Sequence, residues 1–241
     1  MNRFMPWMVA VALCAAPAGA FETDVIPTSA GDLKITFIGH GSLYLTFGNK
    51  VIHVDPYGKL ADYGQLPKAD LVLITHEHRD HLDPAALEKV IKPKTIVIAN
   101  AAAASQVSGS RSMKNGDVQT IDNIKIEAVP AYNLVHKRDN GESFHPKGVG
   151  NGYILTFGDT RVYIAGDTEN TPEMKALQDI DVAFLPMNLP YTMTPAMVAD
   201  AARAFRPAIL YPYHFGKTDT SELVELMADE KGIEVRIRKM E

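Results

Sequence analysis

The feature that most constrains this chain is a run of metal-binding side chains, Thr75-His76-Glu77-His78-Arg79-Asp80-His81. Three imidazoles and a carboxylate would destabilise an apolar core, because burying polar groups without partners costs free energy. An ordinary loop gains nothing from so many rigid histidines, in a chain with 8 of them among 241 residues. Nitrogen and oxygen ligands suit zinc and iron. The run therefore predicts a metal site, with a solvated polar loop as the alternative.

The residues on either side of this run predict the local structure that presents it. Ala69 to Ile74 form a short apolar segment rich in β-branched residues, as a buried strand should. Asp83 and Pro84 are an N-cap residue and a first-turn proline, so a helix is expected from Ala85 to Val90. A strand, a ligand loop and a helix in this order would aim the ligands outward from a rigid edge.

The pattern T-H-x-H-x-D-H resembles the metal-binding signature of the metallo-β-lactamase-fold hydrolases, from about Leu33 to the C-terminus. The resemblance implies an α/β fold, a four-layer αββα sandwich of two mixed sheets flanked by helices, with the site at one edge between the sheets. Flavin-linked di-iron oxygen reductases of this fold typically carry Glu where this chain has His78, which favours the hydrolase branch. Within that branch, the chain is similar to small stand-alone proteins related to L-ascorbate-6-phosphate lactonase.

Residues 1–20 read as a secretory signal peptide. Arg3, an apolar run from Phe4 to Ala16 and an A-x-A site ending at Ala20 predict cleavage at about Ala20 and a periplasmic or secreted protein. The apolar run is short for a membrane span, so a stable anchor is not expected, although a retained anchor helix is the alternative. The segment contains Cys14, the only cysteine. Any metal must then be held by histidine and carboxylate without a thiolate.

Residues 21–241 are expected to form a single hydrolase domain. The length and the 46% hydrophobic composition of the chain suit one domain with a sizeable core. The formal net charge is −5, and loss of Arg3 would make the mature chain more negative, so bulk electrostatics gives no support to nucleic-acid or anionic-membrane binding. The expected partner is a small-molecule substrate, and the sequence specifies no oligomeric state.

Two segments of the chain are similar to each other. Residues 41–55 and 152–167 both read as strand, Gly-polar turn, strand, and they end in Asp55 and Asp167. Shared hairpin chemistry could produce the similarity without a duplication. Two similar halves nevertheless fit the sandwich that the resemblance implies.

By the same resemblance, three later segments supply further ligands. His145 precedes a glycine-containing turn into a strand and resembles the third family motif, with His136 as the competing candidate. Asp167 follows an expected strand from Arg161 to Ala165 and resembles the bridging aspartate, although it could instead cap the next helix. His214 ends a later strand and resembles the last ligand, with a core histidine as the alternative.

The expected ligands form two sets that would hold two divalent ions, with zinc as the first expectation and iron or manganese as alternatives. The sets are His76, His78 and His145 for one ion and Asp80, His81 and His214 for the other, with Asp167 between them. Such a pair can share a hydroxide that attacks a small ester, lactone or phosphoester, with Asp80 and Asp167 as the catalytic candidates. The alternatives are a non-catalytic metal-binding or sensing protein and a di-iron redox enzyme.

Other residues are candidates for supporting roles. Asp55 resembles a family aspartate that orients a ligand without touching metal, and His40 could line the site or be a satisfied turn histidine. The long polar segment from about residue 133 to 150 is a candidate substrate loop. Its cations Lys137, Arg138 and Lys147 could bind an anionic group, although a solvated loop is the favoured interpretation for them.

Overall fold

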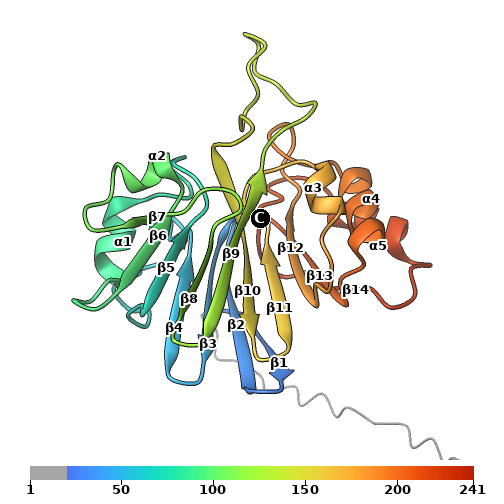
Figure 1. The fold of residues 1–241 in the computed structure, drawn as a ribbon. Coiled ribbons are helices and arrows are strands. Elements are labelled where there is room, and N and C mark those ends of the chain that lie inside the picture. The colour runs from blue at the N-terminus through green and yellow to red at the C-terminus, as the bar shows by residue number, and fades with distance from the viewer. Residues whose placement is uncertain (1–20) are drawn as a thin grey trace, which may run out of the picture.

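A computed structural model describes residues 21–241, so the expected signal peptide lies outside the described residues. The described residues form two seven-stranded sheets that pack face to face, with helices on their outer sides (Figure 1). This arrangement confirms the expected αββα sandwich. Among the described residues, no helix combines the length and apolar character that a bilayer crossing requires.

The first sheet comes from the N-terminal half of the described chain. Its strands lie side by side in sequence order: β1 (Thr23–Thr28), β2 (Gly31–Gly39), β3 (Ser42–Phe47), β4 (Lys50–Val54), β5 (Leu71–Ile74), β6 (Ile96–Ala99) and β7 (Arg111–Ser112). Strands β1 to β4 are antiparallel, whereas β4 to β7 are parallel. Helix α1 (Pro84–Val90) follows β5, and α2 (Ala101–Ala104) follows β6.

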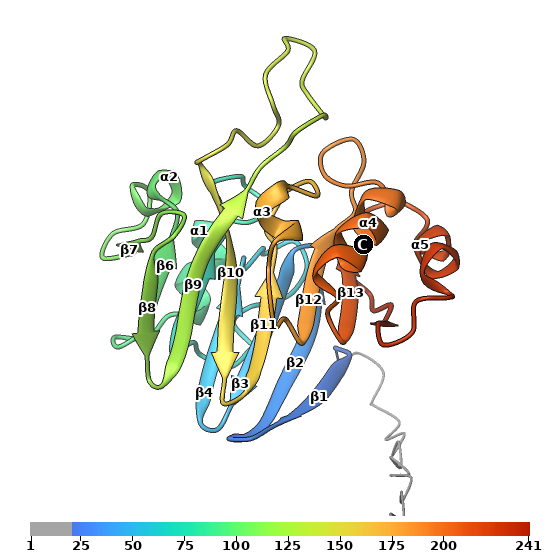
Figure 2. The same ribbon diagram turned by 45° about the vertical axis from the view of Figure 1, so that its right-hand side comes forward.

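The second sheet repeats this plan with the C-terminal half. Its strands are β8 (Val118–Ile121), β9 (Ile124–Ala131), β10 (Gly150–Phe157), β11 (Thr160–Ile164), β12 (Val182–Pro186), β13 (Ile209–Tyr213) and β14 (Glu234–Val235). Strands β8 to β11 are antiparallel and β11 to β14 parallel. Helices α3 (Pro172–Lys175), α4 (Pro195–Phe205) and α5 (Thr220–Met227) cover its outer side (Figure 2). The two similar segments are the hairpins β3–β4 and β10–β11, as predicted.

The continuous apolar sequence of β5 is explained by burial of both of its faces. Leu71 and Leu73 belong to the large core between the sheets, whereas Val72 and Ile74 pack in a second cluster that includes Leu87 of α1. Side chains alternate across a strand, so a strand covered on both sides has no polar position. Each fully buried aliphatic side chain contributes roughly 1.5–3 kcal/mol. The burial therefore fixes the strand end from which the metal-binding run departs.

The cap of helix α1 follows the sequence signals. The Asp83 carboxylate accepts hydrogen bonds from the first-turn amides of α1, as expected, and the Thr171 hydroxyl caps α3. Helix α2 ends at Ala104, and beyond it the Ser110 hydroxyl donates to the carbonyls of Ala104 and Val107 and closes a turn. Strand β9 extends to Ala131, and the loop that follows it projects beyond the sheet edge (Figure 1).

Candidate metal centre

The candidate ligands meet at the edge where the parallel strands of both sheets end. The run after β5, the segment after β11 and the residue after β13 all leave their sheets at this edge, and the β9–β10 loop approaches it as well. The sheet pairing therefore brings together residues that are more than 130 positions apart in sequence, His81 and His214. Seven predicted ligands gather there: His76, His78, Asp80, His81, His145, Asp167 and His214.

The first expected ligand set is assembled as a compact group. His76, His78 and His145 each offer a ring nitrogen, and these atoms lie within 4.8 Å of one another. His76 Nε2 is 3.0 Å from His78 Nδ1, and His145 Nε2 is 3.2 Å from Asp167 Oδ2. The structure thus brings together the three histidines that the sequence assigned to one ion.

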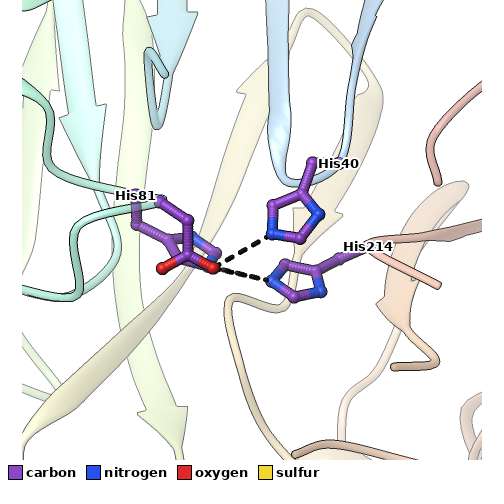
Figure 3. A group of neighbouring side chains, drawn as sticks. His40, His81 and His214 are labelled. Carbon is purple, nitrogen blue, oxygen red and sulfur yellow. Dashed lines mark hydrogen bonds and ion pairs between the residues drawn. The ribbon is translucent and has the colours of Figure 1, made fainter. Parts of the chain in front are cut away.

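The second set contains the three expected residues and a fourth. His81 Nε2 lies 3.2 Å from His214 Nε2, and Asp80 Oδ2 lies 3.7 Å from the same His214 atom. His40, on the turn between β2 and β3, joins this group with its Nε2 at 3.0 Å from Asp80 Oδ2 (Figure 3). Its ring also lies against that of His214, with centroids 3.6 Å apart. His40 thus holds Asp80 in place and can itself serve as a ligand.

The His40 turn approaches the site closely because glycine follows it. A Cβ at Gly41 would lie 2.9 Å from Cε1 of His81 and 3.5 Å from Cδ2 of His214. The backbone carbonyl of His40 also accepts a hydrogen bond of 2.9 Å from the His214 amide. A side chain at position 41 would therefore displace His81 and His214 from the His40 turn.

Asp167 lies between the two sets. Its Oδ2 faces His145, and its Oδ1 is 3.4 Å from His81 Nε2 and 3.6 Å from His214 Nε2. Within the described residues, the buried Oδ1 has no hydrogen-bond partner of ordinary geometry. Burial would raise the Asp167 pKa, but His214 and His81 outweigh it and hold that pKa well below its usual range. A buried carboxylate without a full set of hydrogen bonds is suited to cation binding.

The Asp167 position also requires a glycine before it. Gly166 has a φ of 65°, which strains residues with a side chain, and a Cβ there would lie 2.7 Å from the Asn151 carbonyl oxygen. The β11 strand can therefore turn sharply against the metal-binding run. The helix-capping alternative does not describe this site, because the Thr171 side chain caps α3.

Asp55 fixes the orientation of the run without belonging to a ligand group. Fully buried, it accepts hydrogen bonds from the amide and hydroxyl of Thr75, at 2.8 and 2.6 Å, and it lies 2.8 Å from His81 Nδ1. Since a carboxylate accepts, His81 donates from Nδ1 to Asp55, and its Nε2 is the atom that would bind a metal. The Thr75 hydroxyl donates to Asp55 and can accept from His76 Nδ1 at 3.0 Å, which leaves His76 Nε2 free in the same way.

His145 is held by two residues that the sequence analysis did not identify. Asn133 Oδ1 accepts from the backbone amide of His145 at 2.9 Å and lies 2.6 Å from its Nδ1, so His145 Nε2 faces Asp167. The Asn133 amide group in turn donates to Glu169 at 3.0 Å. Asn133 is recognisable only as the first polar residue of the long loop, and Glu169 has no sequence signal beyond its closeness to Asp167.

The competing candidate, His136, lies in a different environment. Its Nδ1 is 2.7 Å from Glu169 Oε1, and its backbone amide donates to the same oxygen. Within residues 21–241, it belongs to no group of side chains that could hold a metal. The structure therefore places His145 with the other ligands and His136 in the support of the loop.

The chemistry of the donor set fits divalent cations. Burial, reinforced by neighbouring imidazoles, holds the pKa of His76 well below its ordinary value and lowers that of His78. Burial would also lower the His81 pKa, but the carboxylates of Asp167 and Asp55 raise it well above its usual range. The buried carboxylates of Asp167 and Asp55 attract positive charge, and nitrogen and oxygen donors are the ligands that zinc, iron and manganese accept.

A cleft of about 420 Å³ opens onto both ligand sets. It reaches His78 and His145 of the first set, Asp80 and His214 of the second, and Asp167 between them. A cleft of this size accommodates a small molecule. Residues of both sets thus border the same cleft.

Comparison with known proteins agrees with this geometry. Residues 34–214 match the family model of the beta-lactamase superfamily domain. A UPF0173 metal-dependent hydrolase of Koribacter versatilis is 33% identical over 198 residues, covering 76% of this chain and 84% of that protein. A similar protein of Methanoculleus marisnigri, with the same family name, is 31% identical over 189 residues, covering 76% and 81%.

Solved structures show the same relationship. A protein from Parabacteroides distasonis, provisionally named a metal-dependent hydrolase, is 53% identical, with a TM-score of 0.87 over 92% of this chain and 100% of that one. A metallo hydrolase of Ignicoccus hospitalis, 24% identical with a TM-score of 0.71 over 86% and 95%, shares the fold. The chain therefore belongs to the β-lactamase superfamily and, within it, to the UPF0173 metal-dependent hydrolases.

Proposed function

We propose that this protein is a dinuclear metal-dependent hydrolase that cleaves a small ester, lactone or phosphoester. The observation that carries the proposal is the convergence of two His/Asp ligand sets on one buried carboxylate, Asp167, at a cleft of about 420 Å³. When bound, two divalent ions would polarise a carbonyl or phosphoryl oxygen and lower the pKa of a water molecule. Zinc is the first expectation for both ions, with iron and manganese as alternatives.

Each part of the chain has a defined task in this proposal. His76, His78 and His145 would hold one ion and Asp80, His81 and His214 the other, with Asp167 shared. Asp55 and Asn133 keep the Nε2 atoms of His81 and His145 free by accepting from the opposite ring nitrogens. Asp80, whose side chain is 38% exposed, borders the cleft and would be the carboxylate that accepts a proton from an attacking water.

The alternatives are less well supported by the described residues. A storage or sensing site would be expected to enclose its metal, whereas ligands of both sets border an open cleft here. A di-iron redox role is disfavoured by the imidazole of His78 in the first set, where the oxygen reductases of this fold have a carboxylate. The preference for a lactone or phosphoester substrate rests on the resemblance to the ascorbate-phosphate lactonase group.

The test is a substrate screen of purified protein loaded separately with zinc, iron and manganese. The panel contains lactones, phosphodiesters, thioesters and β-lactams, and elemental analysis gives the number of ions per chain. We expect two ions and hydrolysis of a lactone or phosphoester that chelation abolishes. Two bound ions without hydrolysis of any panel member would favour the storage alternative, and one ion per chain would refute the dinuclear centre.

A further inference from the structure

The cleft has a second wall beyond the metal ligands. This wall is formed by Arg79, Arg138, Phe144, Asn188 and Tyr191. It therefore combines two guanidinium groups, an amide and two aromatic rings, and it has no carboxylate of its own. The residues come from the metal-binding run, from the β9–β10 loop and from the segment after β12.

Arg79 lies between the two ligand sets in sequence, since His78 belongs to one and Asp80 to the other. Its side chain is exposed, and within the described residues it makes no ion pair and no side-chain hydrogen bond that the structure records. Most other arginines of the described chain are paired with a carboxylate: Arg161, Arg203, Arg206, Arg236 and Arg238. The N–H donors of the Arg79 guanidinium are thus available to a molecule bound in the cleft.

Arg138 is held in position by an aromatic ring. Its guanidinium lies 5.1 Å from the centroid of the Phe144 ring, and the Phe144 ring meets that of Tyr191 edge-on at 5.0 Å. One weak hydrogen bond of 3.4 Å joins its Nη2 to the Phe144 carbonyl. No carboxylate within residues 21–241 pairs with it. Stacking fixes the group while leaving most of its five donors free.

Asn188 adds a third uncommitted donor to the wall. Its backbone amide and carbonyl both bond to Thr192, which fixes the residue, and its side-chain amide has no recorded partner among the described residues. The other loop cations differ. Lys147 is already bound to Glu173 at 2.8 Å, and Lys137 does not border the cleft.

We propose that this wall is a subsite for an anionic group of the substrate, a carboxylate or a phosphate, while the bond to be cleaved lies against the metal ligands. This inference rests on the proposed hydrolase function. Guanidinium groups match the planar or tetrahedral oxygens of these anions with paired hydrogen bonds. The substrate class is therefore a small ester, lactone or phosphoester that carries a second, negatively charged group.

The experiment measures binding and turnover separately. Calorimetric titration of the metal-loaded protein uses succinate, 3-phosphonopropionate and butyrate, which differ in whether they carry a second anionic group. The variants are Arg79→Gln and Arg138→Gln, and the control is Lys147→Gln from the same loop. We expect the affinity ratio of either dianion to butyrate to fall about 10- to 100-fold in the arginine variants, as for loss of a charge-assisted hydrogen bond. The control should keep the wild-type ratio.

The outcomes separate the subsite from the hydrolase function. Equal affinity for dianions and butyrate in the wild type, or an unchanged ratio in both arginine variants, would overturn the subsite. Tighter binding of the phosphonate than of succinate would identify phosphate as the anion, and the reverse would identify carboxylate. With a hydrolysed ester found, its anionic analogue should show the higher kcat/KM. Retention of dianion binding without any hydrolysis would refute the hydrolase function alone.

Discussion

Replacement of Glu169 by Gln is expected to damage both the stability of the protein and the metal site. The Glu169 carboxylate is fully buried and accepts five hydrogen bonds. Oε2 accepts from the amides of Leu134 and Val135 at 2.7 Å each, and Oε1 accepts from Asn133 and from two donors of His136. A glutamine amide can replace only one of the two oxygens.

The expected loss of stability follows from the backbone donors that lose their acceptor in the variant. With the Gln amide nitrogen in the place of Oε2, two backbone amides face a donor instead of an acceptor. Each stranded buried donor costs about 1–3 kcal/mol, so the free energy of unfolding should fall by about 2–4 kcal/mol, since these amides are only partly buried. The loss of order reaches His145 through Asn133, and disruption of such supporting contacts typically lowers metal affinity about 10- to 100-fold.

Urea denaturation of the metal-free protein measures the first effect, and metal titration with a competing chelator measures the second. The matched control is Glu173→Gln, which changes a carboxylate that is 36% exposed and paired with the exposed Lys147. That variant should lose no more than about 1 kcal/mol. If Glu169→Gln behaves like Glu173→Gln in both assays, the buried network does not position His145.

Four further outcomes are expected. His145→Ala should lower bound metal substantially, whereas His136→Ala should leave it unchanged; elemental analysis showing the reverse would move the third ligand position. Asp167→Asn should stay folded but lose about 10²-fold or more of hydrolysis and require more alkaline pH, because a weaker bridge raises the pKa of bound water. Full turnover with both ions retained would exclude that role. Burial lowers the pKa of His53 to about 4, so acid protonates this histidine in the unfolded chain before it does so in the native state. Between pH 7 and 5, the free energy of unfolding should therefore fall by about 2 kcal/mol more in the wild type than in His53→Gln. Identical pH dependence of urea denaturation in both proteins would contradict this. Exported protein should begin at Phe21, and an intact mass that includes residues 1–20 would show that cleavage does not occur.

Local signals in the sequence predicted the elements that carry the site. The metal-binding run is short and unusual, and the apolar strand before it and the Asp83 cap after it depend only on neighbouring residues. The hairpins that end near Asp55 and Asp167 were also predicted from the sequence, because turn residues and strand alternation act over a few positions. The resemblance then placed His145 and His214 by motif order, and the structure brings both to the same edge.

The sequence alone determined which chemistry the chain offers: histidine and carboxylate ligands at strand ends, on two similar halves, with no cysteine among residues 21–241. Only the tertiary structure decided how those groups are supported and what surrounds them. Asn133 and Glu169 act through a buried network that spans the β9–β10 loop and the segment after β11, and His40 reaches Asp80 from a turn 40 residues away. Arg79, from the metal-binding run, and Arg138, from that loop, line one cleft only in the folded chain. Such contacts depend on strand pairing and loop packing between distant segments, and short-range sequence patterns do not encode that pairing.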